Sequence, residues 1–236
     1  MTLQFHPELG LYRVVESGLA SVSPHGPTAT NPADWIAWHF TKLAFLPQIL
    51  QDGALLCDRR ANPAEVIANE GIKAARLQAA VALPDHPQGC VGDHVPFYFS
   101  PRSPTSYWVL RHTCKANELV FFGVHVATIT HNMPWCASDG NAAQSMLTRF
   151  TKDLGAIGTH VDLNVLTLQS WKDPTGEDQD RIRRRHAEFL VYDQVPLNFI
   201  SHVACYDDTA LAVAQAALRD VGGTRQYGVD KNMFMA

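Results

Sequence analysis

The sequence predicts a single domain of the α+β class, and three observations indicate this. Predicted strands and helices are grouped rather than alternating in strand–helix–strand units, no internal repeat is present, and the glycine motifs of Rossmann and P-loop proteins are absent. With 236 residues, of which 46% are hydrophobic, the chain can bury one sizeable core. We expect a loosely structured Ser- and Pro-rich arm over residues 1–33, the domain over 34–225 and a frayed tail over 226–236.

The first half of the predicted domain contains two strands, each followed by a helix. Residues 35–41 are mostly aromatic or aliphatic and predict a strand, and residues 43–50 carry apolar side chains at helical spacing until Gly53. Residues 58–93 are expected to be partly helical and then a long loop. A second strand and a second helix follow, over residues 95–100 and 105–110.

The second half is expected to be richer in strands, because three of its segments are almost wholly apolar. These predicted strands span residues 118–126, 187–192 and 199–205. A helix is predicted over 141–150 with Asp139 as its N-cap, and a short helix or strand over 161–168. A polar loop over 171–185 and a final amphipathic helix over 209–221, ended by two glycines, complete the chain.

Composition excludes several classes of protein. The five cysteines are scattered without a CxxC pair, and the eleven histidines show no HxxxH or HExxH spacing, so no metal site is expected. No apolar run approaches the roughly 20 residues of a membrane helix, and the N-terminus lacks a signal-peptide pattern, which predicts a cytoplasmic protein without a membrane partner. A net charge of −4 argues against non-specific coating of nucleic acid by the whole surface.

Glu188 is the residue that most requires an explanation. It follows a run of positive charge that includes Arg183, Arg184 and Arg185, and it lies in the apolar segment 187–192. A carboxylate on a buried strand costs several kcal/mol of desolvation unless a partner or a ligand compensates it. Two interpretations stay open on this segment alone, an ion pair with a neighbouring arginine and a functional carboxylate.

Polar side chains also lie on the two strands predicted in the first half. His39 and Thr41 alternate onto one face of their strand, where an imidazole and a hydroxyl could together bind a ribose or a carboxamide. A packed core histidine is the alternative for His39. Tyr98 lies among phenylalanines, where packing is its default role.

Four separated segments of the chain resemble the DarT family of DNA ADP-ribosyltransferase toxins and occur in that family's order. They are Trp38-His39-Phe40-Thr41 with LPQILQDGALL (46–56), IKAARLQAAV (72–81), HVPFYFSPRSP (94–104) and RRHAEFLV (184–191). Together they span residues 35 to about 205, and the third and fourth are the most specific. The resemblance implies a split antiparallel β-core with surrounding helices, and NAD⁺ as co-substrate without a metal.

The resemblance also implies roles for individual residues. Glu188 would be the catalytic glutamate and Arg76 the catalytic arginine, and the loop over 171–185 would recognise the substrate. The NAD⁺-binding set would be His39, Thr41, Leu56, Arg76 and Tyr98. The set that meets DNA would be Arg102, Trp171, Arg183, Arg184 and Arg185, through phosphate contacts and stacking on unpaired bases.

Members of this family transfer ADP-ribose from NAD⁺ to a base of single-stranded DNA, and a macrodomain antitoxin removes the mark. The resemblance therefore implies a toxin of a toxin–antitoxin pair, whose partner is a macrodomain or another ADP-ribosyl-DNA hydrolase. Thymine is favoured over guanine as the acceptor base. Two other classes stay open, an ADP-ribosyl-transferring enzyme that acts on RNA or protein and a nucleic-acid-binding module without activity.

The chemistry of the reaction agrees with these residue types. Breaking the bond between nicotinamide and ribose builds positive charge on the sugar, so a carboxylate at the 2′-hydroxyl stabilises the transition state more than the ground state. A guanidinium such as that of Arg76 could stabilise a deprotonated base or the pyrophosphate of NAD⁺.

Overall fold

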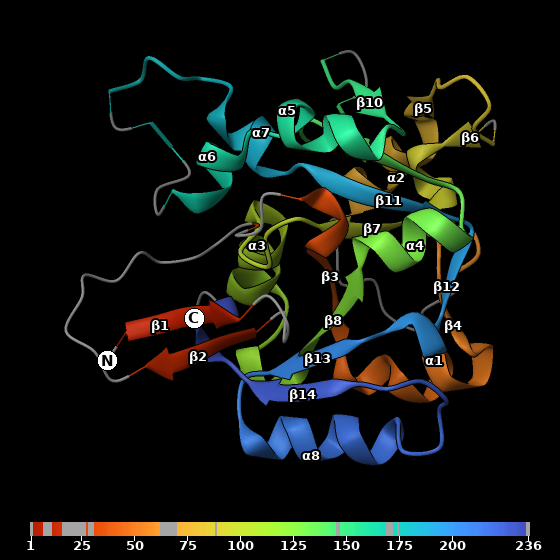
Figure 1. Ribbon diagram of the computed structural model, residues 1–236, viewed down its shortest axis with the longest axis vertical. Helices are drawn as coiled ribbons and strands as arrows, with labels where there is room; N and C mark the ends of the chain where they lie inside the picture. Colours follow the sequence, from red (N-terminus) through yellow and green to blue (C-terminus); the bar gives the residue numbers. More distant parts are fainter. Residues whose placement is uncertain are drawn as a thin grey trace.

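An eight-stranded sheet organises the molecule (Figure 1). The computed structural model describes residues 2–6, 11–15, 27, 31–61, 70–87, 89–144, 147–168, 172–173 and 175–234. In sheet order the strands are β10 (Phe150–Thr151), β9 (Trp135–Ser138), β11 (Glu188–Tyr192), β7 (His94–Tyr98), β3 (Ile36–Lys42), β8 (Leu119–His125), β13 (His202–Cys205) and β14 (Gln226–Val229). Within the described residues, neighbouring strands of this sheet are antiparallel except β13 and β14, which are parallel.

Smaller sheets and helices surround the large sheet. The two-stranded sheets pair β1 (Thr2–His6) with β2 (Leu11–Val15), β4 (Ala54–Leu56) with β12 (Gln194–Pro196), and β5 (Ala80–Val81) with β6 (Gly89–Cys90). The helices are α1 (Leu46–Asp52), α2 (Glu70–Gln78), α3 (Pro104–His112), α4 (Val126–Asn132), α5 (Ile157–His160), α6 (Leu163–Thr167), α7 (Arg181–Arg185) and α8 (Asp208–Ala217). Helix α8 lies against β13 and β14 at the bottom of the view (Figure 1). The predicted α+β class is confirmed.

The large sheet is nearly divided between β7 and β3. Across this boundary the described chain has a single residue pair in register, Trp38 with Tyr98, whereas β3 and β8 pair at seven positions from Ile36 to Lys42. Pro96 lies in β7 and has no N–H to donate to a neighbouring strand. Its carbonyl oxygen instead accepts a hydrogen bond from Nδ1 of His39, 2.8 Å away. The proline therefore contributes to the separation of the two halves.

The core lies on both faces of the sheet and is rich in aromatic side chains. One cluster contains Trp35, Phe97, Phe99, Phe122 and Phe189, all 2% exposed or less. Burial of each such side chain contributes about 1.5–3 kcal/mol to folding. This packing holds β11, β7, β3 and β8 together at the point where their ladder of hydrogen bonds is thinnest.

The strands and helices predicted for most of the domain are confirmed. Strands β3, β7, β8, β11 and β13 and helices α1, α3 and α8 lie at the predicted places, within a few residues at each end. Helix α1 ends where predicted because Gly53 adopts a left-handed conformation with a φ of 67°. The segment 161–168 is helical in α6.

The helix predicted over residues 141–150 is wrong. The N–H of Asn141 donates to the carbonyl of Arg183, and Asp139 accepts a hydrogen bond from the N–H of Arg149 instead of capping a helix. The segment ends in β10, where Phe150 pairs with Ser138. Hydrogen bonds to distant parts of the chain therefore combine with short turns, such as the bond from the N–H of Gln144 to the carbonyl of Asn141, in place of a continuous helix.

Three further expectations are corrected. The arginine run is not loop but helix α7, which follows Asp180. The arm over 1–33 contains β1 and β2. These two strands are formed mostly by β-branched, aromatic and leucine residues and contain neither Ser nor Pro. The tail over 226–236 contains β14 and a short helical turn, and Phe234 is 3% exposed with its ring 5.0 Å from that of Phe121, so its apolar side chains hold it in the core.

Lowering the pH from about 7.5 to about 5.5 is expected to reduce the free energy of unfolding by about 1 kcal/mol through His202. Its ring is fully buried, 5.2 Å from that of His125, and burial, aided by His125, lowers the pKa of His202 to about 3. The unfolded state, with an ordinary histidine pKa near 6.5, binds more protons over this range, so stability falls as the pH falls below that value. Urea unfolding of the wild type and of His202→Gln at both pH values isolates this contribution. An equal pH dependence in the two proteins would contradict it.

Candidate active site

Glu188 begins β11 beside the divided part of the sheet. Its side chain is buried, and its Oε2 atom accepts a hydrogen bond of 2.7 Å from Nη1 of Arg76. Oε1 accepts a second hydrogen bond, of 3.1 Å, from the N–H of Ala142. The charged partner, Arg76, is 112 residues away in the sequence. An ion pair with an arginine of the neighbouring run therefore does not account for this carboxylate.

Arg76 lies near the end of α2 and is held between two carboxylates. Its side chain is buried, and Nε donates to Oδ2 of Asp58 at 2.7 Å while Nη1 donates to Glu188. Burial acts to lower the pKa of Arg76, but Glu188 and Asp58 outweigh it and raise that pKa, so the guanidinium is positively charged. The third nitrogen, Nη2, is buried and has no hydrogen-bond partner among the residues that the structure describes.

This arrangement has two chemical consequences. One guanidinium between two carboxylates leaves a net charge of −1, which suits the approach of a group that becomes positive. The N–H groups of Nη2 lack an acceptor within the described part of the chain, and an unsatisfied buried donor costs about 1–3 kcal/mol. A ligand oxygen or a ring nitrogen that accepts this hydrogen bond would recover that energy.

His39 and Thr41 lie on β3, on the other side of the division in the sheet. The carbonyl of Pro96 can only accept, so Nδ1 of His39 carries the proton and Nε2 is the acceptor in the neutral ring. Burial lowers the pKa of His39, which keeps it neutral at pH 7. Thr41 is 5% exposed, two residues further along the same strand. The structure therefore places both on the strand predicted for them.

Tyr98 connects the two halves of the site. It lies opposite Glu188 in the register of β11 and β7, and opposite Trp38 on β3. Its ring stacks on that of Phe40 at a centroid distance of 6.0 Å. Burial, with the negative charge of Glu188, raises the pKa of Tyr98, so its hydroxyl is protonated. Leu56, the other residue predicted to bind NAD⁺, ends β4 two residues before Asp58.

The arginines predicted to meet DNA are occupied by partners within the protein. Arg183 donates to Asp180 and Asp139, and Arg184 pairs with Asp162 and Asp178. Arg185 is 1% exposed, and its Nη1 donates to the carbonyls of Val165 and Leu168. Burial, with the positive charge of Arg102, lowers the pKa of Arg185 to about 10.

These contacts correct the role predicted for Arg185. A guanidinium inside the protein cannot contact a phosphate, because the side chains and carbonyls around it exclude the DNA. The side chains of Arg183 and Arg184 are 12% and 25% exposed, so their positive charge faces carboxylates more than solvent. Arg102 is partly exposed, next to Ser103, which caps α3. Trp171, predicted to stack on a base, lies outside the described residues.

Four groups at the site were not identified from the sequence. The hydroxyl of Ser138 accepts the N–H of Glu188 at 3.0 Å and donates to the carbonyl of Gly140. Asp58 and the N–H of Ala142 hold the ion pair as described above. His186 lies next to Glu188, whose charge raises the pKa of the ring while burial, the larger effect, lowers it. Of these four residues only His186 lies in one of the four motifs, and Ala142 comes from a segment predicted as a helix.

Gly140 allows this segment to approach α7. A Cβ at this position would lie 2.8 Å from the carbonyl oxygen of Arg183, closer than side chains pack. The same carbonyl accepts the N–H of Asn141. The close approach positions the N–H of Ala142 on the carboxylate of Glu188.

Replacing Asp58 by asparagine is expected to reduce the rate of the transfer reaction that the family resemblance implies about tenfold, with little effect on KM for either substrate. The amide removes one of the two charges that orient Arg76, but it keeps a hydrogen-bond acceptor for Nε. The initial rates of nicotinamide release and DNA modification test this expectation. Asp52→Asn, on the exposed end of α1, is the matched control, and an unchanged turnover in Asp58→Asn would remove Asp58 from this role.

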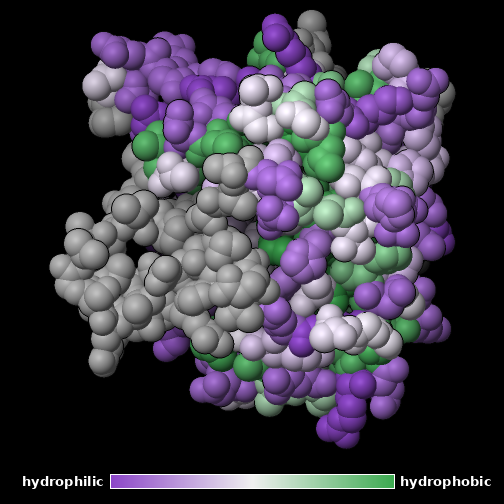
Figure 2. Space-filling model, viewed as in Figure 1, coloured by the Kyte–Doolittle hydropathy of each residue, from purple (hydrophilic) through white to green (hydrophobic). Residues whose placement is uncertain are grey.

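Charged side chains dominate the surface around α7. Hydrophilic residues gather at the upper left of Figure 2, over α6, α7 and the segment that precedes α7. The charges there are the aspartates and arginines of the ion pairs, including Arg181 with Asp173 and Asp178. The ion pairs link α7 to the segment before it, to Asp139 after β9 and to Asp162, which precedes α6.

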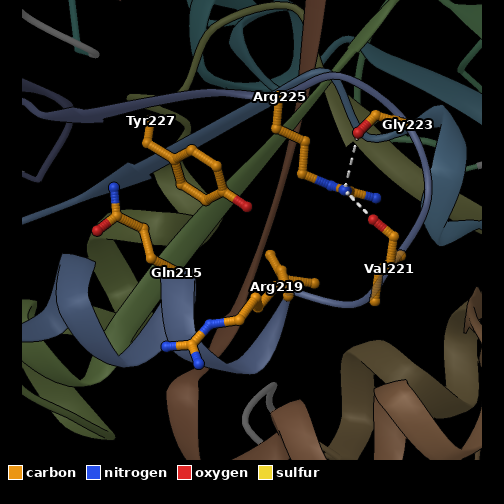
Figure 3. A pocket seen from close by; sticks show the side chains of 7 residues that line it. Gln215, Arg219, Val221, Gly223, Arg225 and Tyr227 are labelled. Atoms are coloured by element: carbon orange, nitrogen blue, oxygen red, sulfur yellow. Dashed lines mark hydrogen bonds between the residues drawn. The ribbon is translucent and has the colours of Figure 1, made fainter.

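A separate hollow lies between α8 and β14, away from Glu188. Gln215, Arg219, Arg225 and Tyr227 contribute to its lining (Figure 3). The guanidinium of Arg225 donates to the carbonyls of Val221, Gly222, Gly223 and Leu197, so it is used to close the end of α8. Four strands of the sheet lie between β11 and β14, so this hollow does not belong to the Glu188 site.

No helix among the described residues is long and apolar enough to cross a membrane.

Comparisons with known proteins extend these observations. A family model described as "ssDNA thymidine ADP-ribosyltransferase, DarT" matches residues 38–235. A Mycobacterium tuberculosis protein named "DNA ADP-ribosyl transferase" is 38% identical over 241 residues, covering 99% of this chain and all of its own. The structure of Thermus sp. 2.9 DarT in complex with ADP-ribosylated ssDNA matches with a TM-score of 0.77, at 24% identity over 89% of this chain and 99% of its own. The same protein in complex with NAD⁺ gives a TM-score of 0.72 at 22% identity, over 88% and 100% of the two chains, and both likenesses confirm the predicted ADP-ribosyltransferase fold.

Proposed function

The chain belongs to the DarT family of single-stranded-DNA ADP-ribosyltransferases, and we propose that it transfers ADP-ribose from NAD⁺ to thymine in single-stranded DNA, with release of nicotinamide. NAD⁺ is a co-substrate and DNA is the acceptor. The observation that carries the proposal is the buried ion pair of Glu188 with Arg76, in which Nη2 of the arginine has no partner among the described residues.

Glu188 is proposed to act on the ribose of NAD⁺. As the bond to nicotinamide breaks, positive charge develops on the anomeric carbon, and the carboxylate stabilises it through the 2′-hydroxyl. The carboxylate is held on both oxygens, by Nη1 of Arg76 and the N–H of Ala142, so it is oriented before the substrate binds. A preoriented group needs no reorganisation during the reaction.

Arg76 is proposed to act on the acceptor base. The thymine ring nitrogen is a weak nucleophile while protonated, and its anionic form is stabilised by an adjacent guanidinium. Nη2 is the nitrogen available for this contact, because Nε and Nη1 are bound to Asp58 and Glu188. One side chain would thereby orient the catalytic carboxylate and accept the negative charge of the base.

The NAD⁺-binding role of the remaining residues follows from their positions. Neutral His39 presents an acceptor nitrogen, protonated Tyr98 presents a hydroxyl, and both lie at the division of the sheet next to Glu188. Thr41 is proposed to assist on the same face of β3, and Leu56 to line the path from β4. Each of these roles is a proposal about a site that NAD⁺ fills during turnover.

Incubation with NAD⁺ and short single-stranded oligonucleotides, each lacking one base, tests the function. We expect an added ADP-ribose by intact mass on every oligonucleotide except the one without thymine, and no product with Glu188→Gln. Loss of product only without guanine would assign the chain to guanine instead. Modification of RNA or protein in place of DNA would contradict the proposed acceptor, and unchanged DNA binding without nicotinamide release would indicate a binding module.

A covalent mark on template bases blocks copying of DNA, so the activity implies a toxin that requires a counterpart. We propose that an ADP-ribosyl-DNA hydrolase, of macrodomain or other type, removes the mark. Expression of the wild type should arrest growth, and Glu188→Gln should not. Rescue by a co-expressed ADP-ribosyl-DNA hydrolase would support the pairing.

A further inference from the structure

Two histidines and one cysteine meet beside β11, the strand that carries Glu188. The ligand atoms of His86, His94 and Cys136 all lie within 4.8 Å of one another, and the three side chains are buried. They come from the loop between β5 and β6, from the start of β7 and from β9. We propose that this cluster binds a zinc ion, with two imidazole nitrogens and one thiolate as protein ligands.

A zinc site would form here after side-chain movements of about an ångström, because zinc-bound sulfur and nitrogen lie about 3.5 Å apart and the ligand atoms all lie within 4.8 Å of one another. The Nε2 atoms of His86 and His94 are 2.8 Å apart. In a tetrahedral zinc site with Zn–N bonds of about 2.0–2.1 Å, two nitrogens lie about 3.3 Å apart, so the two rings would separate by roughly half an ångström. Two nitrogens with one sulfur are ligands that select zinc over magnesium or calcium, and a water molecule would complete the coordination.

The orientation of His94 supports coordination. Its Nδ1 donates to the carbonyl of Cys90 at 2.9 Å, which fixes the tautomer and leaves the lone pair of Nε2 directed at the cluster. Metal-bound histidines almost always have such a partner on the other nitrogen. In the metal-free protein, Nε2–H of His86 donates to Nε2 of His94. Zinc binding would take His86 in its other neutral tautomer, with the proton on Nδ1 and the lone pair on Nε2, and the thiol proton of Cys136 would be released to solvent.

The place of the cluster in the sheet indicates its purpose. Cys136 of β9 pairs with Leu190 of β11, and His94 of β7 pairs with Tyr192 of β11. The two ligands therefore lie on the two strands that flank β11. Glu188, Leu190 and Tyr192 are alternate residues of β11, so their side chains share one face of the strand. A bound zinc would therefore tie both neighbours of the catalytic strand to the loop that holds His86. The site takes no part in the proposed transfer, and it stands whether or not that activity is correct.

Metal analysis and cobalt spectroscopy of the full chain test the site. After incubation with zinc and desalting, we expect about one zinc per wild-type chain, and less than about 0.1 in Cys136→Ser and His86→Gln. Substitution with Co²⁺ should give a thiolate-to-cobalt charge-transfer band in the wild type that Cys136→Ser lacks. Cys205→Ser, which alters an equally buried cysteine on β13, should retain both the zinc and the band.

Two results would overturn the site. One is a wild-type chain that holds less than about 0.1 zinc and shows no charge-transfer band, which would establish the cluster as a hydrogen-bonded histidine pair. The other is equal zinc retention in the wild type and both variants. If a variant fails to fold, the cobalt spectrum of the wild type decides alone, because only a cysteine ligand produces that band. A thermal midpoint raised by zinc in the wild type and in Cys205→Ser, independent of NAD⁺, would further support it.

Discussion

Replacing Glu188 by glutamine is expected to reduce ADP-ribosyl transfer by about 10³-fold, because the amide lacks the charge that stabilises the developing positive charge on the ribose. The substitution preserves the shape of the side chain and an acceptor for the N–H of Ala142. The fold should therefore remain, and KM for NAD⁺ should change much less than kcat.

Single-turnover rates of DNA modification and nicotinamide release measure this effect directly. Glu118→Gln is a suitable control, because this exposed glutamate caps a turn before β8, remote from β11. Its rates should equal those of the wild type. A Glu188→Gln variant that keeps more than about a tenth of the wild-type rate would show that the carboxylate does not act in the transition state.

Replacing Arg76 by alanine is expected to abolish transfer and to reduce the free energy of unfolding by about 3–5 kcal/mol, since it leaves the buried carboxylate of Glu188 without its charged partner. The double variant Arg76→Ala with Glu188→Gln should regain part of that stability, because no buried charge remains unpaired. It should regain no activity. Comparison of the single variant Arg76→Ala with the double variant thus separates the structural role of Arg76 from its role in the reaction.

Urea unfolding of the two single variants and the double variant gives the coupling energy. Arg60→Ala provides the comparison, because Arg60 and its partner Asp193 have side chains that are 45% and 42% exposed. An exposed pair contributes about 0–1 kcal/mol, so this variant should be nearly as stable as the wild type. Equal losses for Arg60→Ala and Arg76→Ala would contradict the importance assigned to burial.

Local patterns were sufficient to predict the strands and helices whose own residues determine them. The strand over Leu119–His125 is apolar up to its last residue, and the helix over Leu46–Asp52 has a glycine at its end, so no distant contact was needed. The segment after Ser138 could not be predicted in this way. Its N–H groups bond to Glu188 and Arg183, which the sequence places more than 40 residues later.

The arginine run shows the same limit for the site. Four arginines before an apolar strand suggested a surface for phosphates, yet Arg181, Arg183 and Arg184 pair with aspartates and Arg185 is buried. Charge can be counted in a sequence, but whether it faces solvent depends on which carboxylates the fold brings to it. The same holds for the histidine and cysteine cluster, whose members show no metal-binding spacing along the chain.

The sequence by itself determined the α+β class, the family and the two residues, Glu188 and Arg76, on which the chemistry depends, because periodicity and short motifs are local properties. Only the tertiary structure decided that these two side chains bind each other, that Asp58 and Ala142 hold them, and that one nitrogen of Arg76 finds no hydrogen-bond partner in the described part of the chain. The physical reason is that a hydrogen bond or an ion pair acts over about 3 Å in space, whatever the separation along the chain.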